Sequence, residues 1–197
     1  MKNVTITVDE AVLEWARVEA ARRGSSVSRM VGEMLAEKMP EFRRGQACDF
    51  VRYARGLLGP LGLSGAPADL FVAHVARECG FGQSVYDYNF GNVRAFASTA
   101  QPWYRNPHNG LPYRAYPSAH DGMAKMVAVV ARSSNAVRQR AWAKLLAGDR
   151  TWYGDLGLSG YYETRDASGR WVPVTPATVG EHQADYDQTL ATVTRCA

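Results

Sequence analysis

The strongest constraint on the fold is a change in character near residue 40, which divides the chain into a short part and a long part. Pro40 ends a helical pattern, and a charged stretch over residues 41–46 follows it. Beyond this stretch aromatic residues, glycine and proline become frequent and helical patterns dominate. Units below about 40 residues rarely bury enough surface to fold alone. The sequence therefore predicts two domains, residues 1–45 and 46–197, and the first needs a partner.

The first domain has the pattern of one strand followed by two helices. Residues 3–8 alternate between polar and apolar side chains, as in a half-buried strand. Asp9 is placed to cap a helix that ends at Gly24, and Ser25 and Ser26 begin a second helix with apolar residues at helical spacing. A lone strand has no neighbour to pair with, which again indicates a second copy of the chain.

The segments KNVTITVDE, LEWARVEAARRG and SSVSRMVGEML, in this order, resemble the ribbon-helix-helix family. The resemblance implies a homodimer through residues 1–45, in which two strands form a ribbon whose outward residues enter the DNA major groove. By position, the residues expected to contact DNA are Asn3, Thr5 and Thr7 on the strand, with Ser26 and Ser28 at a phosphate near the start of the second helix.

The charge balance argues for weak DNA binding. The whole chain has a formal net charge of +4. Up to residue 46 it holds eight Lys/Arg and seven Asp/Glu, a net of +1 (8 − 7), which leaves +3 for the rest. Phosphate contacts supply most non-specific affinity for DNA. The alternative to a DNA-binding dimer is therefore a dimerisation module without DNA contact.

Composition also bears on localisation. No apolar run approaches the roughly 18 residues of a membrane span, and the first residues lack the apolar region of a secretory signal. Three cysteines, Cys48, Cys79 and Cys196, are too few and odd in number for a disulfide framework. We therefore expect a soluble protein made in a reducing cytoplasm.

The second domain is predicted to be mainly α-helical. Helices are expected over residues 48–58, from Pro67 to about Cys79, from a cap at Ser118, over residues 136–147 and from Thr175-Pro176, with a small hairpin between Tyr161 and Val174.

Glu78 is the first candidate for chemistry. At helical spacing it shares a face with Phe71, His74 and Val75, whereas Asp69 projects toward water. It also lies in the last helical turn, where the helix dipole disfavours an anion, and burial acts in the same direction. Both effects keep a proton on Glu78 near neutral pH, as a general acid requires.

Three segments, Arg77–Ser84, Tyr88–Val93 and Tyr113–Ser118, resemble the bacterial glucosaminidase family of lysozyme-like peptidoglycan hydrolases. The resemblance implies a lysozyme-like α-rich domain with a small hairpin. It places Glu78 as catalytic acid, Asn89 and Phe90 in a cleft wall, and Tyr116 as the catalytic tyrosine of the cleft. Gly160-Tyr161-Tyr162-Glu163 is similar to a further Gly-Tyr element of that family.

A second carboxylate is harder to assign. Glycosidases usually use two, about 5–5.5 Å apart for retention and about 6.5–9.5 Å apart for inversion. Only Asp87 lies between Glu78 and Asp121, and Asp121 has the position of a helix cap. Three outcomes follow: Asp87 is the catalytic base, the N-acetyl or hydroxyl group of the substrate assists, or catalysis is lost.

Aromatic side chains gather with polar ones between residues 86 and 116, as expected where rings stack on sugars and amides bind hydroxyl groups. The expected substrate-binding residues are Tyr88, Asn89, Phe90, Trp103, Tyr113 and Arg114. The four histidines lack ligand spacing, so no metal and no cofactor are expected.

The leading hypothesis is a hydrolase of peptidoglycan glycan strands, dimerised by its first domain. Such a protein without a signal would reach the cell wall by lysis, through a holin or in a phage particle. The alternative is a DNA-associated or structural protein that retains an inactive, glycan-binding lysozyme-like domain.

Overall fold

A computed structural model describes residues 7–31, 46–93, 95, 102–105, 110–165 and 170–196 of the chain. By its internal contacts the chain divides into two units, Met1–Glu41 and Phe42–Ala197. The domain boundary expected after residue 45 falls outside the described residues.

The first unit contains helix α1 (Glu10–Arg22), which begins as the sequence predicts. The carboxylate of Asp9 accepts a hydrogen bond from the backbone N–H of Val12 at 2.9 Å, which satisfies one free donor of the first turn. Residues 27–31 are also helical, and the hydroxyl of Ser26 accepts the N–H of Arg29 at 3.2 Å as their cap. The strand predicted over residues 3–8 lies mostly outside the described residues.

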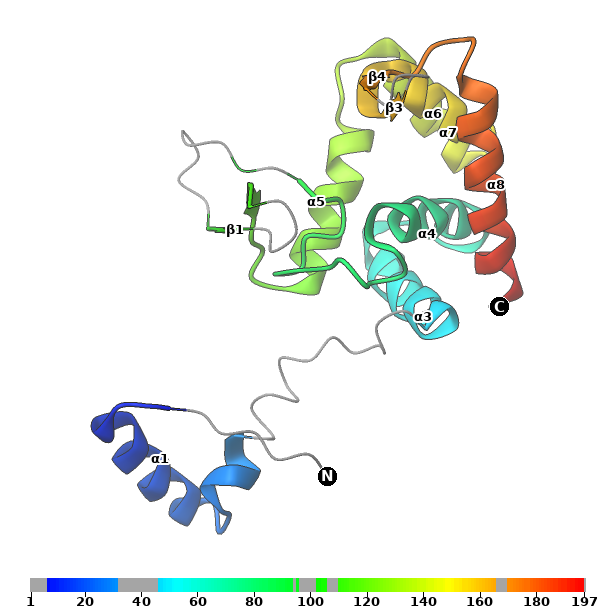
Figure 1. The fold of residues 1–197 in the computed structure, drawn as a ribbon. Coiled ribbons are helices and arrows are strands. Elements are labelled where there is room, and N and C mark those ends of the chain that lie inside the picture. Colours follow the sequence, from blue (N-terminus) through cyan, green and yellow to red (C-terminus); the bar gives the residue numbers. More distant parts are fainter. Residues whose placement is uncertain are drawn as a thin grey trace. The chain divides into compact units, whose positions relative to one another are not determined.

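The second unit is mainly helical, which confirms that part of the predicted fold class (Figure 1). Its helices are α3 (Ala47–Leu58), α4 (Gly65–Cys79), α5 (Ala119–Ala131), α6 (Ala136–Leu146), α7 (Trp152–Leu156) and α8 (Val179–Arg195), with short turns η1 (Gly59–Leu61) and η2 (Gly157–Tyr161). Strands β1 (Trp103–Arg105) and β2 (Pro112–Arg114) form one antiparallel hairpin, and β3 (Glu163–Arg165) and β4 (Trp171–Pro173) form another.

Helix α4 forms the centre of this unit, in contact with α3, α6 and α8 (Figure 1). Its apolar residues from Leu70 to Ala76 are all buried, as is Cys79 at its last position. A helix that is apolar on all sides is stable only in an interior, because each face needs a partner. The surrounding helices supply those faces, and together they make one continuous core.

A buried chain of hydrogen bonds joins three of these helices. The indole N–H of Trp152 on α7 donates to the hydroxyl of Tyr186 on α8 at 2.8 Å. That hydroxyl in turn donates to the backbone carbonyl of Leu70 on α4 at 2.9 Å. Both side chains are fully buried, so these bonds satisfy polar atoms that would otherwise lose water without compensation. The chain fixes α7 and α8 against α4.

Several element boundaries differ from those predicted. Helix α4 begins at Gly65, two residues before Pro67, and α8 begins at Val179 instead of at Thr175-Pro176. Thr175 forms a turn instead, since its carbonyl accepts the N–H of Thr178 at 3.0 Å and of Val179 at 2.9 Å. The cap at Ser118 is confirmed: its hydroxyl accepts the N–H of Asp121 at 3.1 Å.

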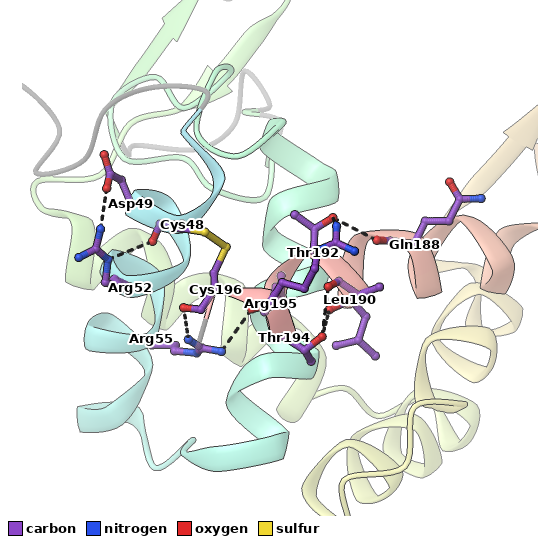
Figure 2. The surroundings of a disulfide bond; sticks show 12 residues. Cys48, Asp49, Arg52, Arg55, Gln188, Leu190, Thr192, Thr194, Arg195 and Cys196 are labelled. Atoms are coloured by element: carbon purple, nitrogen blue, oxygen red, sulfur yellow. Dashed lines mark hydrogen bonds and ion pairs between the residues drawn. A yellow bond between two sulfur atoms is a disulfide. The ribbon is translucent and has the colours of Figure 1, made fainter.

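The cysteine prediction needs a correction. Cys48, near the start of α3, and Cys196, just after α8, form a disulfide across 148 positions of sequence, and Cys79 is free and buried (Figure 2). An odd count excludes full pairing but leaves room for one bond. Disulfides persist in oxidising surroundings, so this bond does not match the expected reducing cytoplasm.

Arg55 reinforces the same junction. Its guanidinium donates to the carbonyl of Cys196 at 3.2 Å and to that of Val193 at 3.4 Å, both at the end of α8 (Figure 2). It also pairs with the carboxylate of Asp69 on α4 at 2.7 Å. One arginine on α3 therefore holds both α4 and the end of α8.

Among the described residues, no helix combines the length and the apolar character that crossing a bilayer requires.

Reduction of the disulfide should lower the free energy of unfolding by about 4 kcal/mol, because the bond restricts the unfolded chain over a long loop. Urea unfolding with and without reductant measures this difference. Cys48→Ser should unfold like the reduced protein and gain nothing from an oxidant, whereas Cys79→Ala should keep the response to reductant. Three free thiols in the denatured, unreduced protein would contradict the pairing.

Candidate active site around Glu78

Glu78 lies in the last turn of α4, and the chain leaves that helix by a sharp turn. Gly80 ends the helix with φ of +57°, a left-handed conformation that glycine adopts without strain. The side-chain amide of Asn92 donates to the carbonyl of Glu78 at 2.5 Å. This bond satisfies one of the free carbonyls at the helix end and joins the segment up to Asn92 to the backbone of Glu78.

The carboxyl group of Glu78 has the property that the sequence predicts. Burial raises the pKa of Glu78 to about 7, while a hydrogen bond from Tyr162 and the charge of Arg77 act against that rise. Near neutral pH an appreciable fraction of Glu78 is therefore protonated. A carboxylic acid with such a pKa can donate a proton at the pH where it also recovers one.

Tyrosines from two other elements surround this carboxyl group. Burial raises the pKa of Tyr153 on α7 to about 12 and raises the pKa of Tyr161 and of Tyr162 further, and the negative charge of Glu78 adds to each rise. Arg77 lies 5.9 Å from the ring centre of Tyr153 and pairs with Asp185 of α8 at 3.6 Å. The acid therefore lies beside neutral phenols, with one cation held near it.

The segment after α4 is the most strained part of the described backbone. The four non-glycine residues with positive φ among the described positions are Phe81, Asp87, Tyr88 and Asn92, at +45° to +56°. Each such residue costs free energy of order 1 kcal/mol or more, and such positions cluster at functional sites. This concentration directly after Glu78 supports a functional role for the segment.

A glycine of α5 makes room for this strained segment. A Cβ atom at Gly122 would lie 1.8 Å from the carbonyl oxygen of Tyr88. The backbone N–H of Tyr116 also donates to the carbonyl of Asp87 at 2.9 Å. The two left-handed residues are therefore held between α5 and the segment that precedes it.

Asn89 and Phe90, expected in a substrate-facing wall, lie in the interior and need a correction. Asn89 is 0% exposed, and its amide donates to the carbonyls of Val93 and Arg114 at 2.9 and 3.0 Å. Its oxygen accepts the N–H of Val93 at 2.8 Å, which saturates the side chain with backbone partners. Phe90 is 1% exposed in the main core. Both residues hold the segment in shape and present no surface to a ligand.

Asp87 and Tyr116, the other expected catalytic residues, lie beside each other in the backbone. Asp87 is exposed, and its carboxylate adds to the effect of burial in raising the pKa of Tyr104 to about 12. Tyr116 is half-buried, and burial raises its pKa. Among the described residues its hydroxyl finds no hydrogen-bond partner.

The remaining expected substrate residues are divided between surface and interior. Trp103 on β1 is 54% exposed, with the guanidinium of Arg105 5.9 Å from its ring centre. Tyr113 on β2 is buried and stacks on Tyr104 at 6.0 Å. Arg114 pairs with Trp103 across the hairpin and is half-buried, as is Tyr88.

In the first unit, Asn3 and Thr5 lie outside the described residues, while Thr7, Ser26 and Ser28 are exposed. The hydroxyl of Ser26 already caps residues 27–31. Contact of these residues with DNA stays a prediction.

The described residues give little support to a metal site or to a reactive cysteine. No group of three His, Cys, Asp or Glu residues among the described positions is arranged to hold a metal ion. Burial raises the pKa of the Cys79 thiol to about 12, which leaves it protonated and unreactive.

Helical spacing places His74 on the face of Glu78, and the Gly-Tyr resemblance includes Tyr162, but neither signal assigns these residues a role at the acid. The sequence prediction gives no such role to Arg77, Tyr153 or His182 either. Helical spacing alone cannot show that two separate elements deliver tyrosines to the end of a third.

No protein-family model and no curated protein matches this sequence. Among solved structures, the glycoside hydrolase domain of FlgJ from Salmonella typhimurium is 18% identical, with a TM-score of 0.49 over 76% of this chain and 99% of that one. A peptidoglycan hydrolase from Sphingomonas sp. A1 is 19% identical, with a TM-score of 0.50 over 77% of this chain and 100% of that one. This chain has the fold of the Sphingomonas enzyme. The expected fold is thereby confirmed as one that a peptidoglycan hydrolase also has, whereas the ribbon-helix-helix module stays a prediction.

Gly122→Ala should destabilise the protein by about 3 kcal/mol and distort the segment after α4, because the new methyl group collides with the backbone of Tyr88. Thermal unfolding and binding of peptidoglycan fragments measure the two effects. Gly180→Ala in α8 is the matched control, since nothing lies within 4 Å of a Cβ atom there, and it should not lower stability. Equal melting temperatures for the two variants would contradict the close approach.

Proposed function

We propose that the second unit, residues 46–197, is a glycosidase that cuts the glycan strands of peptidoglycan, with Glu78 as its general acid. The observation that carries this proposal is the burial of Glu78 at the end of α4, which raises the pKa of its carboxyl group to about 7. The fold shared with the Sphingomonas peptidoglycan hydrolase supports the choice of substrate.

In the proposed reaction Glu78 transfers its proton to the glycosidic oxygen as the bond from that oxygen to the sugar carbon breaks. The sugar carbon develops positive charge and gains a hydroxyl group from water, whose other proton passes to the assisting base and finally returns to Glu78. The resulting Glu78 carboxylate is stabilised by the hydrogen bond from Tyr162 and by the charge of Arg77, both of which lower its pKa.

The group that assists on the sugar carbon has two candidates. Asp87 is exposed and lies in the strained segment, where it could act as a base. The N-acetyl or hydroxyl group of the substrate could act instead. Tyr88 and Trp103 are the predicted residues with exposed or half-exposed rings for stacking on sugars. Arg114 pairs with Trp103 across the hairpin, and the backbone of Tyr116 hydrogen-bonds to that of Asp87, the neighbour of Tyr88.

Glu78→Gln should lower the rate of glycan cleavage by about 10²- to 10⁴-fold, because the amide cannot donate the proton. Purified peptidoglycan is digested with each protein, and mass spectrometry of the separated products measures the rate of glycan cleavage. In the unchanged protein the rate should fall as the pH rises through about 7, where Glu78 loses its proton. Glu181→Gln, an exposed glutamate of α8, is the control and should keep full activity. Equal rates for Glu78→Gln and the unchanged protein would refute this role.

A second proposal concerns the first unit, which we infer to be a dimerisation module. Val8, Val12, Trp15 and Val18 are between 44% and 55% exposed along α1 and the residues before it. Its buried cluster among the described residues is only Ala16, Ala20 and Met30 with Val27 against them. Such a small core does not stabilise a unit of this size, and a second copy would cover the exposed apolar side chains.

Trp15→Arg should convert a dimer to a monomer, because it places a charge in the contact between copies. Light scattering during gel filtration measures the mass. Glu14→Gln is the control, since Glu14 is exposed beside Trp15 and forms only a surface pair with Arg17 at 3.5 Å. A monomeric unchanged protein at high concentration would rule out this module.

A further inference from the structure

A histidine lies directly behind the proposed acid. His74 precedes Glu78 by four positions on α4, which is about one helical turn, and it is 0% exposed. Aromatic rings surround it with centres 5.3 to 6.0 Å away: Phe71, Trp152, Tyr153, Tyr161 and Tyr162. An imidazole in such a place costs desolvation free energy and needs a reason to be there.

Its one polar contact leads toward Glu78. The Nδ1 atom of His74 forms a short hydrogen bond with the hydroxyl of Tyr162. Hydrogen bonding by the same side chain lowers the pKa of Glu78, and Tyr162 is also a hydrogen-bond partner of Tyr153. Tyr162 therefore stands between the imidazole and the acid.

The direction of these bonds follows from counting hydrogens. An ionised carboxylate can only accept, so Tyr162 must donate its single hydrogen to Glu78. The two lone pairs of the Tyr162 oxygen are then left as acceptors, one toward the hydroxyl of Tyr153 and one toward His74, so that His74 donates through Nδ1–H. The same arrangement serves protonated Glu78, because the acid directs its own hydrogen to the glycosidic oxygen and still accepts from Tyr162 at its other oxygen.

The other nitrogen of His74 is consistent with this arrangement. Nε2 is buried, and no group in the described part of the chain hydrogen-bonds to it. With the hydrogen on Nδ1, Nε2 is a bare lone pair. Protonating it would add a charge and a donor with no acceptor, and burial together with the charges of Arg77 and His182 lowers the pKa of His74 to about 3. The imidazole therefore stays neutral throughout the working range of pH.

The charged and titratable groups around the pair come from every neighbouring element. Helix α4 adds Arg77, α7 adds Tyr153, and η2 adds Tyr161, over which Arg138 of α6 lies at 5.2 Å. Helix α8 adds Asp185, and it also adds His182, whose ring stacks on Tyr153 at 4.7 Å. Burial lowers the pKa of His182 to about 4, so Arg77 is the cation nearest the acid.

We propose that His74 is a positioning residue for the reaction: its Nδ1–H holds the hydroxyl of Tyr162 in the orientation that donates to Glu78. This proposal rests on the proposed function, in which Glu78 is the acid. Without His74 the hydroxyl hydrogen of Tyr162 is free to turn away, and the carboxylate formed by proton transfer loses its stabilising bond. Glu78 then becomes a weaker acid.

Two variants separate the hydrogen bond from the packing of the ring. His74→Phe keeps an aromatic ring and removes the donor. His74→Asn removes most of the ring and keeps an N–H close to the position of Nδ1. The rate, the KM and the melting temperature of each are measured against pH with soluble peptidoglycan fragments.

His74→Phe should lower kcat by about tenfold at little change in KM, and the pH at which the rate falls should rise by about one unit. His74→Asn should restore that pH even where its melting temperature is lower. An unchanged pH profile in His74→Phe, or an equal shift in His74→Asn, would overturn the positioning role.

A measurement on the unchanged protein does not depend on folding of the variants or on turnover. Nitrogen-15 NMR of His74 distinguishes a protonated Nδ1 from a protonated Nε2, and carbon-13 NMR of Glu78 gives its pKa. A hydrogen on Nδ1 supports the proposal, whereas a hydrogen on Nε2 overturns it. Because neither reading needs catalysis, an inactive protein would refute the proposed function and leave this result standing.

Discussion

The burial of α4 is the constraint on which the rest of the second unit depends. A helix with apolar residues on all its faces must be covered on every side, and α3, α6 and α8 cover it. The last turn of the same helix carries the acid Glu78. Burial that stabilises the fold therefore also raises the pKa of Glu78. Stability and acidity have one physical cause here, since both come from excluding water from the same helix.

The residues around the acid show how the fold offsets the cost of that exclusion. Phenols and imidazoles supply hydrogen bonds without a full charge, so they solvate Glu78 in either protonation state. The hydrogen bonds from Trp152 to Tyr186 and from Tyr186 to Leu70 lie in the same interior. The hydroxyl of Tyr186 thereby joins α7 to α4.

The strained segment after α4 depends on small details of its neighbours. Asp87 and Tyr88 have left-handed backbone conformations, which are unfavourable for residues with a side chain. The hydrogen bonds of Asn89 and the close approach of Gly122 keep the backbone in these conformations. The sequence predicts Asn89 as a ligand-binding residue because amides often bind sugars. In the structure the side-chain amide of Asn89 binds backbone groups and fixes the conformation of the segment instead. Only the three-dimensional structure distinguishes this structural role from ligand binding.

The sequence predicts features that depend on neighbouring residues, and it does not predict contacts between residues that are far apart in the chain. The caps at Asp9 and Ser118 and the helix end at Gly80 depend on neighbours within a few positions, so spacing predicts them. Tyr162 reaches His74 across 88 positions, and Cys48 reaches Cys196 across 148. Such pairs depend on how helices pack, for which one sequence carries no periodic signal.

The disulfide has a topological consequence for this site. Cys48 and Cys196 close nearly the whole second unit into a covalent ring, and α4, Tyr153 and Tyr162 all lie within it. A protease that cuts one exposed hairpin opens the ring but does not produce two separate pieces. Glu78, Tyr153 and Tyr162 then stay on one covalent molecule, so a chain that is cut once retains these parts of the candidate site.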